Sequence, residues 1–254
     1  MCSAADAGLI DEALSPKTLI RYLDDPKLTD VLRTLIRESA APLADVESRF
    51  AVDSTGFSTC NYERWFDHKW GRERSKRQWV KAHVIVGVHT NVVTDVLVTD
   101  NVGDGSGDAP QLPELVSNTA QRFAMNEVSA DKAYMSRQNF DAIEAVGAVP
   151  YIPFRSGTTG EGPAMWRRMW ALFMYRGEEF GKHYHARSNV ETTFSMIKRK
   201  FGASLRAKSF VAQRNEVLCK VLAHNLVVLV GAMYELGITA EFWGAPAPGG
   251  CDVH

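Results

Sequence analysis

The spacing of apolar residues along the chain changes about fifty residues from its start. Before that point, apolar residues recur at helical spacing in two short runs, 19–23 and 28–36, which are interrupted by Pro26 and Pro42. We therefore expect a short helical N-terminal segment over residues 1–48. After it, runs of β-branched and aromatic residues replace the helical spacing, and these indicate strands.

Five strands are predicted in the next hundred residues. The first is an apolar run that ends at Asp53, and two Val-rich runs that meet at Asn91 suggest a hairpin; the five strands cover residues 50–53, 79–89, 92–99, 127–130 and 148–154. Helices are predicted at 112–123 and 136–146, and through most of the chain after Gly160. Strands first, followed by alternation with helices, predict an α/β fold with a mixed five-stranded sheet flanked by helices.

Length and composition are those of a globular protein with one principal domain. The 254 residues can bury a large core, and the hydrophobic fraction of 45% and charged fraction of 23% are ordinary. We assign residues 1–48 to the helical segment, 49–240 to the principal domain and 241–254 to a disordered tail rich in Pro and Gly. The chain begins without a signal-peptide pattern, and its longest apolar stretch, 226–233, is too short to cross a bilayer, so we expect a cytoplasmic protein that does not contact a membrane.

Basic residues are concentrated in two segments, although the formal net charge is −1. Residues 64–81 hold seven basic and two acidic residues, and residues 155–208 hold eleven basic and four acidic residues. Tryptophans stand among these charges at positions 65, 70, 79, 166 and 170, and aromatics among cations suit a surface that follows a nucleic-acid backbone. Two solvated faces explain the same pattern, and the spacing of four between Trp166 and Trp170 is also that of a core stripe.

Two aspartates stand where a predicted strand meets a polar turn. Asp53 follows Val52 in the first strand, and Asp131 follows Ala130 in the fourth. A lone Asp in such a place usually begins a turn. Two carboxylates at the ends of adjacent strands can instead share a metal ion, and we keep both interpretations at this point.

Glu191 belongs to a predicted helix with a clear apolar face. With Ser188 it fits a capping box, S-x-x-E, which explains Glu191 as a helix cap. At about 100° per residue, Glu191 and Lys198 lie together at the border of the apolar face, whose members are Val190, Phe194, Ile197 and Phe201. A helix packed on a sheet by this face would direct both polar residues along the rim of the sheet.

These residues resemble a known family. Tyr184, Arg187, Glu191 and Lys198 have the spacing of the Y-R-E-K signature of insertion-sequence DDE transposases. The sequences around the first two acids, Val-Asp-Ser-Thr-Gly at Asp53 and Ala-Asp-Lys-Ala-Tyr at Asp131, resemble the contexts of the first and second Asp of that family. The resemblance covers residues 50–236 and implies an RNase H-like fold. Compared with the family, the chain is short before the first Asp and between the second Asp and the Glu.

The resemblance also implies a chemistry and a set of partners. Asp53, Asp131 and Glu191 would hold two Mg²⁺ or Mn²⁺ ions, which cleave transposon ends and join them to target DNA. The same resemblance assigns phosphate contacts to Arg187 and Lys198 and a contact to the adjacent DNA backbone to Tyr184. We expect double-stranded DNA as the partner, both transposon ends and target, and a homodimer or higher oligomer in the DNA complex, acting on the nucleoid.

Two alternatives remain open at the level of sequence. A nuclease of the same fold would cut DNA without joining it, and a decayed or domesticated transposase would bind DNA without catalysis. The histidines add little. His183 and His185 are expected to face DNA or solvent, although they could bind a metal, and His224 and Asn225 are expected to be hydrogen-bonded residues of the core.

Overall fold

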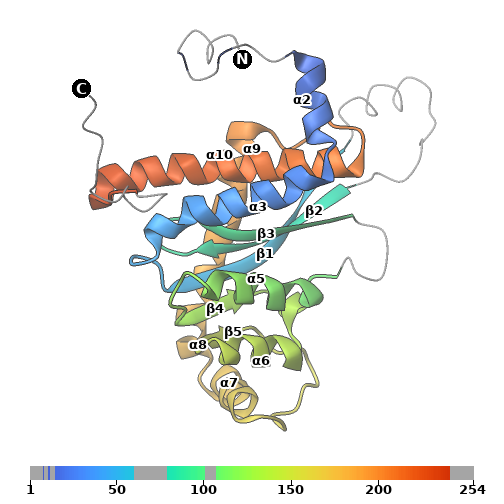
Figure 1. Cartoon of the computed structure of the whole chain (residues 1–254). Coiled ribbons are helices and arrows are strands. Elements are labelled where there is room, and N and C mark those ends of the chain that lie inside the picture. The colour runs from blue at the N-terminus through green and yellow to red at the C-terminus, as the bar shows by residue number, and fades with distance from the viewer. Residues whose placement is uncertain (1–7, 9–10, 12–14, 60–78, 101–106, 241–254) are drawn as a thin grey trace, which may run out of the picture.

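A central sheet with helices on both faces organises the protein (Figure 1). The computed structural model describes residues 8, 11, 15–59, 79–100 and 107–240. The predicted tail at 241–254, most of the first basic segment, and Trp65 and Trp70 lie outside the described residues. The division into segments 1–48, 49–240 and 241–254 therefore stays a prediction.

The sheet has five strands in the order β3-β2-β1-β4-β5. The strands are β1 (Arg49–Ser58), β2 (Trp79–Gly87), β3 (Val93–Asp100), β4 (Glu127–Ala130) and β5 (Val149–Tyr151). The first three strands pair antiparallel, whereas β4 pairs parallel with β1 and with β5. This mixed sheet, flanked by helices and preceded by a helical segment, confirms the RNase H-like fold.

Four of the eight α-helices in the described residues begin at a side-chain cap. The α-helices are α2 (Pro16–Leu23), α3 (Pro26–Ala40), α5 (Leu112–Ala120), α6 (Arg137–Ala145), α7 (Ala164–Tyr175), α8 (Gly177–Tyr184), α9 (Ser188–Phe201) and α10 (Phe210–Leu236). Short 3-10 turns lie at η1 (Ala41–Leu43), η2 (Ala109–Gln111), η3 (Lys132–Tyr134) and η4 (His185–Arg187). Ser15, Asp25, Ser136 and Ser209 each accept a backbone N–H at a helix start. Pro26, which interrupts the helical pattern, is thus the first residue of α3.

Successive residues of β1 point to opposite faces of the sheet and enter different cores. Phe50 and Val52 belong to a cluster that includes side chains of α5 and α6. Ala51 and Phe57 belong to a second cluster that includes side chains of α9 and α10. Because the side-chain period of a strand is two, Asp53 faces the α9 side and Ser54 faces the α5 side.

Strand β1 is longer than the sequence predicted. We expected it to end at Asp53, but it continues to Ser58 because β2 pairs with it along its whole length, from Phe50↔Gly87 to Ser58↔Trp79. Parallel pairing with β4 does stop at Val52↔Ala130. Asp53 therefore lies inside one strand pair and just past the end of the other.

The predicted hairpin and the core polar residues are confirmed. Asn91 in the β2–β3 turn has φ 64°, a conformation that Asn tolerates better than most residues. His224 Nε2 lies 2.9 Å from the carbonyl oxygen of Asn91. Asn225 accepts a hydrogen bond from Val93 N and donates to the Val93 carbonyl oxygen, which fixes α10 to the edge of β3.

The apolar run 226–233 lies within the long helix α10. Among the described residues, α10 is the one helix whose length and composition would allow it to cross a membrane. Almost half of the most apolar 18-residue stretch of this helix is buried in the fold. It packs on α3 and on the sheet, as a core helix does.

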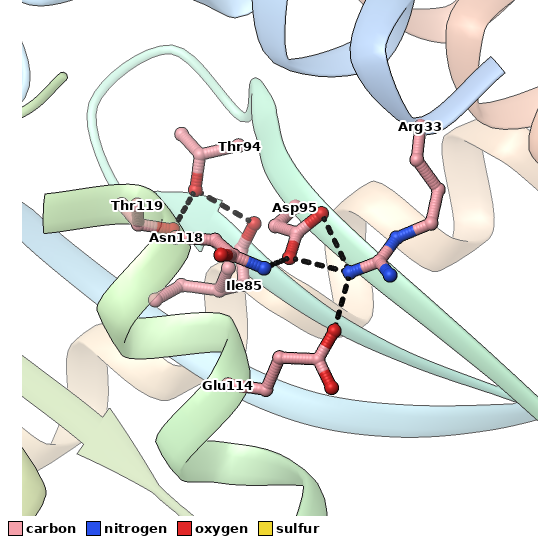
Figure 2. A network of polar contacts seen from close by, with 7 residues as sticks. All are labelled: Arg33, Ile85, Thr94, Asp95, Glu114, Asn118 and Thr119. Carbon is pink, nitrogen blue, oxygen red and sulfur yellow. Dashed lines mark hydrogen bonds and ion pairs between the residues drawn. The ribbon is translucent and has the colours of Figure 1, made fainter. Parts of the chain in front are cut away.

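A buried carboxylate on the edge strand β3 joins α3 to α5 (Figure 2). Asp95 of β3 is fully buried, and its Oδ2 accepts hydrogen bonds from Arg33 of α3 at 3.0 Å and from Asn118 of α5 at 2.8 Å. Arg33 also pairs with Glu114 of α5 at 2.9 Å. Next to Asp95, Thr94 shares a hydrogen bond of 2.9 Å with Thr119. These contacts hold α3 and α5 to the edge strand β3.

Arg33→Met should destabilise the fold by about 3 kcal/mol, because it leaves the Asp95 charge buried with Asn118 as its remaining side-chain donor. Urea unfolding followed by circular dichroism measures the change. Glu114→Gln, which removes the exposed partner of Arg33, should cost less than about 1 kcal/mol. Equal losses in the two variants would contradict the assignment of the buried pair as the dominant contact.

Candidate active site

Asp53 is a half-buried carboxylate on the α9 face of the sheet. Its Oδ1 accepts a hydrogen bond from Ser54 N at 2.8 Å. Burial raises the pKa of the Asp53 carboxyl, and the negative charges of Asp131 and Asp108 raise it further, against the lowering effects of the Ser54 N–H and of Arg187. Ionisation of Asp53 therefore costs free energy, and a nearby positive charge would reduce that cost.

Asp131 is the second acid, and the sheet places it beside Asp53. Parallel pairing joins Val52 to Ala130, so the next residues along the two strands are Asp53 and Asp131. The Asp131 carboxylate accepts a hydrogen bond from Lys132 N at the start of η3. It is therefore both the beginning of a turn, as the simpler interpretation expected, and a neighbour of the first acid.

Helix α9 carries the third acid, and its apolar face is as predicted. Val190, Phe194 and Ile197 are buried against the sheet, whereas Glu191 is exposed. The predicted capping box does not form. Ser188 Oγ donates to the carbonyl oxygen of His185, and the helix start has no side-chain cap.

Arg187 lies between the first and the third acid. Its Nη1 is 2.7 Å from Asp53 Oδ2, and its Nη2 is 2.6 Å from Glu191 Oε1. The guanidinium thus joins β1 to α9. Within the described part of the chain, no group of three or more His, Cys, Asp or Glu side chains is placed to hold a metal ion as it stands.

Tyr184 and Lys198 lie on either side of these contacts. Tyr184 is half-buried, with its ring 5.9 Å from that of Phe180, and burial raises the pKa of its hydroxyl. Lys198 Nζ donates to Thr55 Oγ1 at 2.6 Å, so it reaches the residue two positions beyond Asp53 on the same face of β1. Burial lowers the pKa of Lys198. The expectation that α9 directs Glu191 and Lys198 along the sheet is consistent with both contacts.

The histidine expectations were partly wrong. His183 does not simply face DNA or solvent, because its Nδ1 lies 2.9 Å from Glu127 Oε1 and its ring stacks on Tyr151 with 4.5 Å between centroids. His185 is exposed. Trp166 is buried and Trp170 is packed against the same core, as the stripe interpretation predicted.

The model of one protein family, described as transposase DDE domain, matches residues 45–226, which is well over half of the chain. The chain belongs to this family. Searches of curated proteins and of solved structures gave no match. Asp53, Asp131 and Glu191, together with Tyr184, Arg187 and Lys198, lie within the matched residues. The family places the protein among DNA-binding enzymes of nucleic-acid phosphoryl transfer.

A second polar cluster of the transposase domain, which the sequence did not predict, lies on the α5 face of the sheet, opposite the face of Asp53. The Asp108 carboxylate is 2.7 Å from Lys81 Nζ and 3.3 Å from His83 Nδ1. Its third partner is the Ser54 side chain, next in sequence to Asp53. Burial alone would raise the pKa of Asp108, but its polar contacts with His83, Lys81 and Ser54 outweigh burial and hold the pKa well below its usual range.

One signal for this cluster was present in the sequence. Lys81 and His83 alternate in a strand that is otherwise rich in Val, so they had to share one face. Their partner could not be found in the same way, because Asp108 lies in a Gly/Asp-rich stretch without periodicity.

Asp108→Asn should lower the free energy of unfolding by about 2 kcal/mol at pH 7, because it removes the negative charge that Lys81 contacts in a largely buried site. The folded pKa of Asp108 is depressed, so its contribution is complete above the unfolded pKa of about 4 and is lost as the pH falls below that value, by up to about 1.4 kcal/mol per pH unit. Urea unfolding between pH 3 and 7 measures this.

Asp100→Asn is the matched control, since Asp100 is an exposed carboxylate at the end of β3. It should change stability by less than about 0.5 kcal/mol. A difference between wild type and Asp108→Asn that stays constant down to pH 3 would contradict the depressed pKa.

Proposed function

We propose that this protein catalyses metal-dependent cleavage of transposon ends and their strand transfer into target DNA. The observation that supports the proposal is that Asp53 and Asp131 follow neighbouring positions of two paired strands, and that Arg187 links Asp53 to Glu191 of the helix. Three carboxylates from separate elements, inside a matched transposase DDE domain, are what this chemistry requires.

The donor set fits two Mg²⁺ or Mn²⁺ ions. Carboxylate oxygens are the ligands that these hard cations prefer. The pKa of Asp53 is raised mainly by burial and further by neighbouring negative charge, so a cation at this place would stabilise the ionised carboxylate. Asp53, Asp131 and Glu191 would hold the ions, which activate water or a 3′-hydroxyl and stabilise the leaving oxygen.

The cationic side chains of the site would bind DNA phosphate. The Arg187 guanidinium has donors that suit phosphate oxygens, and Lys198 of α9 supplies a second positive charge beside Thr55, two residues beyond Asp53 on β1. Tyr184, which interacts with Arg187, would contact the adjacent DNA backbone. Under this proposal the enzyme acts on chromosomal DNA in the cytoplasm as a homodimer or higher oligomer.

Asp53→Asn, Asp131→Asn and Glu191→Gln should each reduce metal-dependent DNA cleavage by at least about 100-fold, because each removes a ligand charge without changing the side-chain volume. The assay uses DNA that carries the ends of the element, with Mg²⁺ or Mn²⁺, and scores nicked and joined products separately.

Glu178→Gln on α8 is the control, because Glu178 is exposed and outside the site. It should cleave at the wild-type rate. Near-normal cleavage by any of the three site variants would remove that residue from the proposed ligands. Cleavage without joined product would instead favour a nuclease, and binding without cleavage would favour a transposase remnant.

Lys198→Ala should weaken DNA binding and lower the slope of log affinity against log salt by about 1, as expected for one lost phosphate contact. Fluorescence anisotropy at several salt concentrations measures the slope. Lys200→Ala is the control, because Lys200 is exposed on the same helix about 200° further round. If both variants keep the wild-type slope, Lys198 does not contact phosphate.

A further inference from the structure

The Arg187 side chain lies between two of the acids of the site. Its two terminal nitrogens bind carboxylates of two different elements, Asp53 of β1 and Glu191 of α9, at 2.7 Å and 2.6 Å. Asp131 adds negative charge close to Asp53. The guanidinium therefore neutralises the same oxygens that the proposed function assigns to divalent cations.

The two contacts of Arg187 differ in strength. Toward Asp53 both side chains are shielded, with 20% and 18% of their surface exposed, so solvent screens the attraction little. Toward Glu191 the carboxylate is 59% exposed, and such pairs on a helix surface are weak. Asp53 is thus the anchor of Arg187, and Glu191 can exchange its partner readily.

We propose that Arg187 is the internal counter-ion of the active site, and that it makes the binding of divalent cations and of DNA mutually dependent. The inference rests on the proposed function. A divalent cation and a guanidinium repel each other and compete for the same carboxylate oxygens, so a cation binds well only when Arg187 leaves Asp53. Phosphate is the other strong partner of a guanidinium, and DNA supplies it.

The consequence is a positive coupling between two ligands. DNA phosphate withdraws Arg187 from the acids and raises their affinity for cations. By thermodynamic reciprocity, cations raise the affinity for DNA by the same factor. The site would then load its cations on DNA and hold them weakly elsewhere, which restricts phosphoryl transfer to the bound substrate.

The test measures Ca²⁺ binding to the full chain by isothermal titration calorimetry, since Ca²⁺ also prefers oxygen ligands. Without DNA, Arg187→Gln should bind Ca²⁺ at least about tenfold more tightly than wild type, because the competing charge is gone. Arg199→Gln is the matched control. Arg199 is exposed on the same helix, and its loss changes the net charge equally, so its Ca²⁺ affinity should stay within about twofold of wild type.

The coupling is measured by repeating the titration with a saturating short DNA duplex. DNA should raise the Ca²⁺ affinity of wild type and of Arg199→Gln by at least about fivefold, and that of Arg187→Gln by clearly less. Equal or weaker Ca²⁺ binding by Arg187→Gln without DNA, or a DNA effect equal to that in wild type, would overturn the inference.

Two further variants separate the possible failures. Arg187→Lys keeps the charge but loses the fork that spans two carboxylates, so its Ca²⁺ affinity should lie between those of wild type and Arg187→Gln; it also serves if the Gln variant does not fold. Asp53→Asn should abolish Ca²⁺ binding. If Asp53→Asn abolishes Ca²⁺ binding but both Arg187 variants leave it unchanged, the counter-ion is rejected and the proposed function is kept. If Asp53→Asn does not affect Ca²⁺ binding, or if no variant binds Ca²⁺, both are rejected.

Discussion

The parallel pairing of β1 with β4 brings Asp53 and Asp131 to neighbouring positions, and the rest of the site is arranged around the cost of burying the Asp53 charge. Pairing stops at Val52 and Ala130, so Asp53 and Asp131 follow at neighbouring positions. Burial and neighbouring charge raise the pKa of Asp53, which means that the ionised form needs positive charge nearby. Arg187 provides that charge. Because Arg187 also contacts Glu191, the neutralisation of Asp53 on β1 helps to place the first turn of α9.

Helix α9 is fixed to β1 at both of its ends, which keeps the acids in register. At its start, Arg187 binds Asp53. After its end, the chain returns to β1, where Ser58 N donates to the carbonyl oxygen of Ala203 at 3.2 Å and Leu205 N donates to that of Ser58 at 2.8 Å. Between these points the apolar face of the helix packs on the sheet. The position of Glu191 is therefore set by the fold as a whole more than by its local sequence.

Much of this architecture could be predicted from local patterns. Apolar periodicity located the strand before Asp131 with its correct ends, and it identified the buried face of α9. The length of β1 could not be predicted in the same way, because Ser54, Thr55 and Gly56 are turn-forming residues that remain in the strand through pairing with β2. The partners of Asp53 were equally hidden, since Arg187 is 134 residues away and Asp108 lies in a stretch without periodicity.

The failure of the predicted capping box shows how such a long-range contact overrides a local one. Taken alone, a cap stabilises a helix by about 1 kcal/mol, whereas an exposed pair such as Arg187 and Glu191 contributes about 0.3–0.5 kcal/mol. Local energies would therefore favour a cap at Ser188. However, a cap needs a non-helical residue, and η4 carries the helical conformation through Arg187, with φ −55° and ψ −31°. Asp53 has already ordered the Arg187 side chain at this point, so Glu191 pairs with it at little further loss of entropy. Ser188 therefore does not cap α9, because the helical conformation already includes Arg187, the residue that neutralises Asp53.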